Sequence, residues 1–158
     1  MKSLAMPVLL LCSVCLLSCD ENGNSSRCIG PLKPVFYLTD TSGILKTTFH
    51  SGESFRMRFS VTNTTGQTLS YMYTGSPTGF VILQDDSVLV VQQDCAVPLF
   101  LARDSLLACA STTAEWLAPQ PLCSKMNVTL PPGSYTARLI TAIPVPRSDD
   151  IPFEILSR

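Results

Sequence analysis

The sequence predicts an all-β protein, an antiparallel sandwich of about seven to nine strands. Short segments in which apolar and polar residues alternate recur along the chain, and turn residues separate them. No long segment has the 3.6-residue period of an amphipathic helix, and the 158 residues include twelve prolines. Because alternation buries one face of a strand and leaves the other in water, short strands at this spacing are typical of a sandwich.

The clearest strand is Phe55–Val61, in which odd positions are apolar and even positions are polar. Gly52-Glu53 precedes it as a turn, and the polar run from Asn63 to Gly66 ends it. Thr68–Tyr73 and Phe80–Leu83 are expected to form the next strands. The same period therefore repeats along the middle of the chain.

A β-hairpin is expected at "ILQDDSVLVV", where Asp85-Asp86 forms a two-residue tip before Val88–Val91. Further strands are predicted where apolar residues alternate within Met126–Leu130, Tyr135–Leu139 and Phe153–Ile155. Pro131-Pro132-Gly133 places a sharp corner between the first two of these.

The segment from Ala96 to Ala118 has no clear period. We expect it to hold an edge strand, a loop and one helical turn at Ser111–Leu117. Its lone tryptophan, Trp116, is expected in the core, which is where a single large apolar ring is most often found.

The N-terminus has the pattern of an export signal. Lys2 precedes 14 uncharged residues, Leu4–Leu17, a run too short for a permanent membrane span of roughly 17–25 apolar residues. The run ends in Leu16-Leu17-Ser18-Cys19, which resembles a bacterial lipobox. This resemblance implies cleavage before Cys19 and attachment of diacylglycerol to its thiol, and acyl chains of this kind anchor a protein to a membrane.

We therefore divide the chain into a signal peptide (1–18), a lipidated tether (19–27) and one domain (28–158). The tether is polar and has no aromatic or β-branched residue before Arg27, so it lacks the means to form a core. Asp20 resembles an inner-membrane retention signal, whereas an acidic start also resembles surface-export tethers. The expected location is the bacterial cell envelope, outside the cytoplasm, with the choice of membrane left open.

Four cysteines remain in the expected domain besides Cys19, and an exported protein permits their oxidation. Four cysteines allow three pairings, of which we favour Cys95–Cys109 and Cys28–Cys123. A loop of about 15 residues closed by a disulfide gains roughly 3 kcal/mol in the chain-entropy model. Metal binding is the rival interpretation, but the chain has no CxxC pair and a single histidine, so we expect neither metal nor cofactor.

Two stretches carry a family resemblance: "SGESFRMRFSVTNTTGQTLSYMYTG" at 51–75 and "LPPGSYTARL" at 130–139. Together with Trp116 they resemble the bacterial intracellular proteinase inhibitor (BsuPI-like) family over about residues 45–157. The resemblance implies an immunoglobulin-like β-sandwich. In the second stretch, Tyr135 is positioned to send its hydroxyl back to nearby backbone, as in the tyrosine corner of such sandwiches.

Charge and motifs argue against several function classes. Removal of Lys2 with the signal leaves ten basic against twelve acidic residues, which gives no electrostatic basis for binding nucleic acid. A Ser-His-Asp arrangement would have to use His50, and no GxSxG elbow accompanies it. We expect His50 in the turn that ends at Gly52, and Asp85-Asp86 and Asp149-Asp150 at turn tips, so no enzyme activity is expected.

One segment offers a candidate binding surface. The oily stretch "CAVPLFLARDSLLAC" from Cys95 to Cys109 would present Leu101, Arg103 and Leu106 to a partner. Ordering by the disulfide would lower the entropy cost of binding. The competing interpretation is that Pro98–Leu101 is an inward-packed strand.

We therefore expect a membrane-anchored, non-enzymatic binding or assembly module with a protein partner. The alternative is a proteinase inhibitor that presents the Cys95–Cys109 loop.

Overall fold

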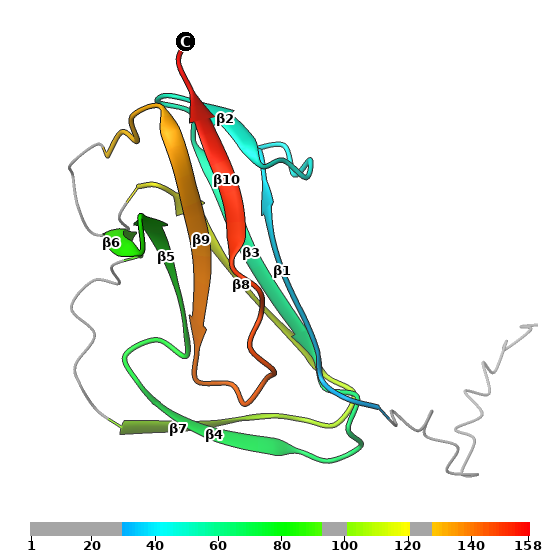
Figure 1. Ribbon diagram of the computed structural model, residues 1–158. Coiled ribbons are helices and arrows are strands. Elements are labelled where there is room, and N and C mark those ends of the chain that lie inside the picture. Colours follow the sequence, from blue (N-terminus) through cyan, green and yellow to red (C-terminus); the bar gives the residue numbers. More distant parts are fainter. Residues whose placement is uncertain (1–29, 93–100, 121–127) are drawn as a thin grey trace, which may run out of the picture.

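The computed structural model describes residues 30–92, 101–120 and 128–158, and these residues form an all-β protein (Figure 1). Within them no residue lies in a helix, so no helix long and apolar enough to cross a bilayer occurs there. The described strands are β1 (Lys33–Thr39), β2 (Thr48–His50), β3 (Phe55–Thr62), β4 (Leu69–Thr74), β5 (Thr78–Gln84), β6 (Ser87–Val91), β7 (Leu101–Leu106), β8 (Ser111–Ala118), β9 (Gly133–Thr141) and β10 (Ile151–Leu156).

The strands form three sheets. One has three strands in the order β1-β3-β8, a second has five in the order β2-β10-β9-β5-β6, and a third pairs β4 with β7. All pairings are antiparallel except that of β10 with β2, which is parallel. The two larger sheets lie face to face, and the β4–β7 pair lies across one end of them (Figure 1).

Strand β3 shows why this sequence folds into strands. Phe55, Met57, Phe59 and Val61 are at most 1% exposed, whereas the residues between them are partly exposed. This is the alternation predicted from the sequence, and β3 fills the middle of its sheet between β1 and β8.

Aromatic rings join the two larger sheets. Phe55 of β3 stacks on Phe49 of β2 with ring centroids 4.5 Å apart, and it lies 5.2 Å from Phe153 of β10. At the other side of the core, Phe36 of β1 stacks on Phe80 of β5 at 6.0 Å. Aromatic pairs of this kind contribute about 0.5–1.5 kcal/mol beyond the burial of their area.

The predicted hairpin and corner are both present. Asp85 and Asp86 connect β5 to β6 with φ angles of 48° and 60°, the pair of positive values that a type I′ turn requires. Tyr135 is 3% exposed, and its hydroxyl donates a hydrogen bond of 2.7 Å to the carbonyl of Pro131. Trp116 is fully buried, as expected for a core residue.

Two expectations about secondary structure are wrong. Ser111–Leu117 forms no helical turn, because it belongs to β8 and pairs with β3 along its whole length. Its alternation is disguised, since the outward-facing Leu117 is apolar and the inward-facing Ala114 is small. Residues 128–130 are not a strand, and Met126 lies outside the described residues. Two consecutive prolines, which lack the N–H that a ladder needs, follow this segment directly.

Candidate binding groove beside the β4–β7 arm

The strands β4 and β7, which we call the arm, continue the β3–β8 ladder through a bend. The bend is organised by Asn63, which is fully buried. Its amide nitrogen lies 2.7–3.0 Å from the carbonyl oxygens of Gln67, Leu106 and Leu107. Its side-chain oxygen accepts bonds of 3.1 and 2.8 Å from the N–H and hydroxyl of Thr65. Asn63 therefore supplies at the bend the hydrogen bonds that a regular ladder would otherwise make.

The bend also contains Cys109, which takes part in a disulfide. Its backbone N–H donates a 2.9 Å bond to the carbonyl of Asn63, and its φ angle is 63°. The partner cysteine lies outside the described residues, as do the predicted positions Cys19, Cys28, Cys95 and Cys123. The backbone bond from Cys109 to Asn63 thus joins the two sides of the bend where β7 passes into β8.

The register of the arm separates the three residues that the sequence singled out. Directly opposite residues share one face of a sheet, so Leu101 beside Thr74 and Arg103 beside Met72 lie on the outer face. Leu101 is 65% exposed and Arg103 is also exposed. Leu106 lies on the other face and is 5% exposed within the core cluster.

The expectation that Leu106 meets a partner is therefore wrong. Because side chains alternate between the two faces of a strand, the side chain of residue 106 points to the face opposite to those of residues 101 and 103. Leu101 does not pack inward, and Pro98 lies outside the described residues.

A groove of about 410 Å³ runs between the arm and the ends of β5, β6 and β9. Met72 of β4, Val91 of β6 and Ile140 of β9 line it and are 51%, 47% and 56% exposed. Gly79 of β5 also lines it, and a Cβ atom at Gly79 would meet no atom within 4 Å. Thr74, Ser76 and Thr141 add hydroxyl groups to the lining. The groove is thus open and of mixed polarity, with three exposed apolar side chains and unfilled space at Gly79.

Of two arginines near the groove, Arg138 forms an ion pair and Arg103 forms none among the described residues. Arg138 of β9, which pairs with Val81 in the sheet, forms a two-pronged contact with Asp150 at 2.6–3.0 Å. Hydrogen bonding from Arg138 holds the pKa of Asp150 below its usual value, although partial burial acts in the opposite direction. Within the described part of the chain, Arg103 has no ion-pair partner.

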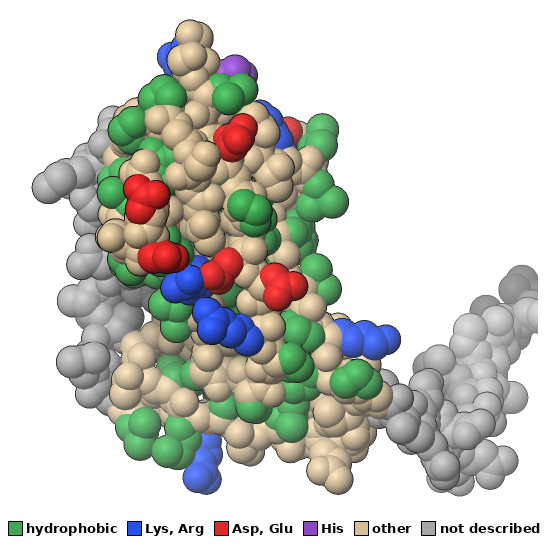
Figure 2. Space-filling view, viewed as in Figure 1, with side chains coloured by type: hydrophobic (Ala, Val, Ile, Leu, Met, Phe, Trp, Pro, Cys, Tyr) green, Lys and Arg blue, Asp and Glu red, His purple; other side chains and the backbone are tan. Residues whose placement is uncertain are grey.

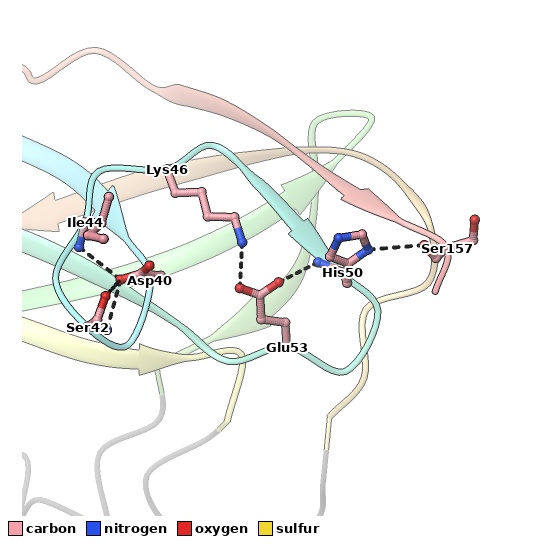
Figure 3. A network of polar contacts seen from close by, with 7 residues as sticks. All are labelled: Asp40, Ser42, Ile44, Lys46, His50, Glu53 and Ser157. Carbon is pink, nitrogen blue, oxygen red and sulfur yellow. Dashed lines mark hydrogen bonds and ion pairs between the residues drawn. The ribbon is translucent and has the colours of Figure 1, made fainter.

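A second polar region surrounds His50 (Figure 3). The His50 N–H donates a 2.8 Å bond to Glu53, and its ring nitrogen Nδ1 lies 3.2 Å from the carbonyl of Ser157. Glu53 also receives a 2.7 Å bond from Lys46. Burial alone would raise the pKa of Glu53, but the bonds from Lys46 and the His50 amide hold it below its usual value.

These contacts place His50 at the end of β2, beside the predicted turn. In Figure 3 the ring of His50 contacts the backbone carbonyl of Ser157, not a serine hydroxyl. A cavity of about 290 Å³ lies beside it, lined by His50, Glu53 and Leu130 among others. Across residues 30–92, 101–120 and 128–158, no three His, Cys, Asp or Glu side chains are grouped to hold a metal ion.

The outer face of the three-stranded sheet is polar and internally paired. Glu115 of β8 contacts both Arg56 and Arg58 of the neighbouring β3. Thr113 lies on the same exposed face, opposite Ser60. This face therefore differs in chemistry from the groove on the five-stranded sheet.

Comparison with known proteins identifies no family. No family model and no curated protein matches the chain. Among solved structures, the chain is similar to the Pseudomonas fluorescens alkylpurine DNA glycosylase AlkC bound to DNA containing an abasic site analog. The sequence identity is 13% and the TM-score is 0.43, and the match covers 80% of this chain and 30% of that one. It is also similar to a β-glucosidase from Listeria innocua in complex with gluconolactone, at 15% identity, a TM-score of 0.41, and coverage of 81% and 17%.

The chain thus spans less than a third of either protein. Similarity at this level carries neither a family nor a function to this chain.

Proposed function

We propose that the protein is a lipid-anchored binding or assembly module of the bacterial cell envelope, without enzymatic activity, whose groove binds a protein partner. The observation that supports this most directly is the groove itself. Met72, Val91 and Ile140 come from three different strands, yet all three line the groove and are about half exposed there, beside the hydroxyl groups of Thr74 and Thr141. Contiguous exposed apolar surface on a soluble domain typically marks an interaction site.

The groove also indicates the chemistry of the partner. Its apolar side chains favour a segment that inserts aliphatic or aromatic residues, since anchors of this type dominate interface energetics. Arg103 projects from the same face as Met72 and is exposed, so an acidic residue beside the apolar segment would add charge complementarity. We infer a peptide segment with apolar anchors and an acidic flank.

The anchor and the fold family remain part of this proposal. The lipobox-like Leu16–Cys19 supports attachment at Cys19, and the disulfide at Cys109 supports an oxidising location. The buried Trp116 and the hydroxyl bond of Tyr135 support an immunoglobulin-like sandwich related to the BsuPI-like family.

Proteinase inhibition is the second candidate. It is favoured by the exposed Arg103 on a strand pair that ends at a disulfide-bonded cysteine. An inhibitor would slow serine proteases and would lose this effect on Arg103→Ala. Unchanged rates across a protease panel would remove this candidate.

The groove is tested by cross-linking in intact envelopes. A photoreactive amino acid replaces Ile140 in the full-length chain, and a matched variant carries it at the exposed Thr113 on the opposite sheet. The proposal predicts an adduct of one defined mass from position 140 and none of that mass from position 113. A second change, Gly79→Leu, places a side chain in the open space of the groove. The proposal predicts that this change abolishes the adduct.

Two results would contradict the groove as the binding site. One is an identical adduct pattern from positions 140 and 113, which would indicate random collision. The other is an adduct from position 140 that survives Gly79→Leu in a protein whose urea midpoint is unchanged.

A further inference from the structure

The loop between β1 and β2 carries two of the most exposed large apolar side chains of the described residues. Ile44 is 67% exposed and Leu45 is 71% exposed. Two large apolar side chains next to each other form an exposed apolar patch, which is informative where a single exposed leucine is not. Neither the groove nor the arm accounts for them, because they lie at the end of β1.

This loop is held in one conformation (Figure 3). The carboxylate of Asp40 accepts bonds of 2.9, 2.6 and 2.9 Å from the N–H and hydroxyl of Ser42 and the N–H of Ile44. Gly43 adopts a φ of 94°, which a residue with a side chain rarely does. An isolated bridge joins Leu45 to Thr39. Ile44 and Leu45 are therefore displayed by a preorganised turn, so their exposure is built into the loop.

A third exposed apolar side chain lies on β1 itself. Val35 is 51% exposed on this strand, which forms one edge of its sheet. Figure 2 shows hydrophobic side chains following one another down the margin of the molecule where Figure 1 places β1 and the loop after it. Lys33 lies at the start of β1, and Lys46, which is paired with Glu53, lies at the far end of the loop. Charges also lie between these ends: Asp40 in the loop, and Arg58 opposite Tyr37, where it contacts Glu115. Lysine stems extend along an apolar surface while their ammonium groups stay in water.

The position of this edge relative to the anchor decides what covers it. The twelve residues from Cys19 to Gly30 are joined by eleven Cα–Cα steps, so they span at most about 36–40 Å when fully extended. Strand β1 has seven residues and is about 23 Å long. Because the tether joins the domain just before β1 and exceeds its length, the whole edge can reach the bilayer in which the anchor is held.

We propose that the edge formed by Val35, Ile44 and Leu45 rests on the lipid surface to which the protein is anchored. This inference rests on the anchoring part of the proposed function. Contact with lipid orients the domain with β1 against the membrane, and it leaves the groove, on the other sheet, open to a partner.

The test uses the full mature protein with its native anchor in phosphatidylcholine vesicles that contain brominated acyl chains. Bromine quenches tryptophan fluorescence only within the bilayer, and the intrinsic Trp116 is fully buried and so reports the background. A tryptophan introduced by Ile44→Trp is compared with one introduced by Val88→Trp, a slightly less exposed apolar position (59%) on β6. Both substitutions are at surface positions, and the urea midpoint verifies that each variant is folded.

The proposal predicts a blue shift and loss of most of the added emission at position 44, with no quenching of the emission added at position 88. Equal emission at the two positions in protein that floats with the vesicles overturns the lipid contact while leaving the anchor intact, and it assigns Ile44 and Leu45 to a protein partner instead. Protein that fails to float with the vesicles overturns the anchor, and the lipid contact with it. The two failures are therefore distinct.

Discussion

Asn63 offers the sharpest test of how the arm is held, because one buried side chain serves both sides of the bend. In Asn63→Leu the amide is replaced by an apolar group of similar size. The carbonyls of Gln67, Leu106 and Leu107 then lose the side-chain amide that donates to them. The N–H of Thr65 loses its acceptor. Because residue 63 is 0% exposed, water does not replace the lost hydrogen bonds at that position.

The expected cost follows from counting these bonds. Two amide hydrogens and one accepted backbone bond give three net hydrogen bonds, each worth about 1 kcal/mol, and groups left unpaired in a buried place add to this. We therefore expect the free energy of unfolding to fall by about 3–4 kcal/mol. Since small domains have about 5–15 kcal/mol in total, the loss is large but leaves a folded protein to measure.

The assay is urea unfolding of the oxidised mature chain. The matched control is Thr62→Val at the adjacent position, whose hydroxyl bonds Ser111 at the surface, so its expected change is within about 0.5 kcal/mol. If Asn63→Leu and the control differ by less than about 1 kcal/mol, Asn63 does not organise the bend. The reasoning would then be wrong at its first step.

Asn63→Asp gives a second measurement with a definite sign. A carboxylate at this position would face three carbonyl oxygens without solvent, so its folded-state pKa would lie above the unfolded value of about 3.9. Its ionisation therefore destabilises the folded state at neutral pH. Relative to the parent protein, this variant regains stability as the pH falls through the raised pKa.

Three further predictions concern the body of the domain. Asp150, whose pKa is lowered by Arg138, contributes stability above its unfolded pKa that is lost as the pH falls through its folded pKa. Asp150→Asn should therefore cost up to about 1 kcal/mol at pH 7, and urea unfolding at successive pH values should show this cost disappearing once the pH lies below the folded-state pKa. Tyr135→Phe removes the bond to Pro131 and should lower the free energy of unfolding by about 1–2 kcal/mol, whereas an unchanged urea midpoint would show that the corner contributes nothing. The mature chain, with two disulfides, should gain about four mass units on reduction, and four reactive thiols in exported protein would contradict the pairing.

Much of the fold could be predicted from local pattern alone. The strict alternation of Phe55–Val61 and the adjacent aspartates at 85 and 86 identify a strand and a hairpin without reference to the rest of the chain. Pattern failed at Ser111–Leu117 because a tertiary contact, the pairing with β3, outweighs the weak local signal. It failed at 128–130 because the two prolines that follow, which lack the N–H a ladder needs, outweigh a period of two over so few residues.

The candidate site could be predicted only in part. Leu101 and Arg103 were found from their place in an oily segment between cysteines, and both are exposed. The sequence does not reveal the register of β7, in which Leu106 lies on the face opposite to Leu101 and Arg103, so its burial could not be predicted. Met72, Val91 and Ile140 are brought together by the packing of three separate strands, for which no signal exists in the linear sequence.

The anchor is the claim on which location, oxidation state and membrane contact all depend. Mass spectrometry of the N-terminal peptide of protein purified from envelopes tests it most directly. Our account predicts that the chain begins at Cys19 and that its thiol carries a diacylglycerol group. A chain that retains Leu16–Ser18, or that begins at an unmodified Cys19, would contradict it.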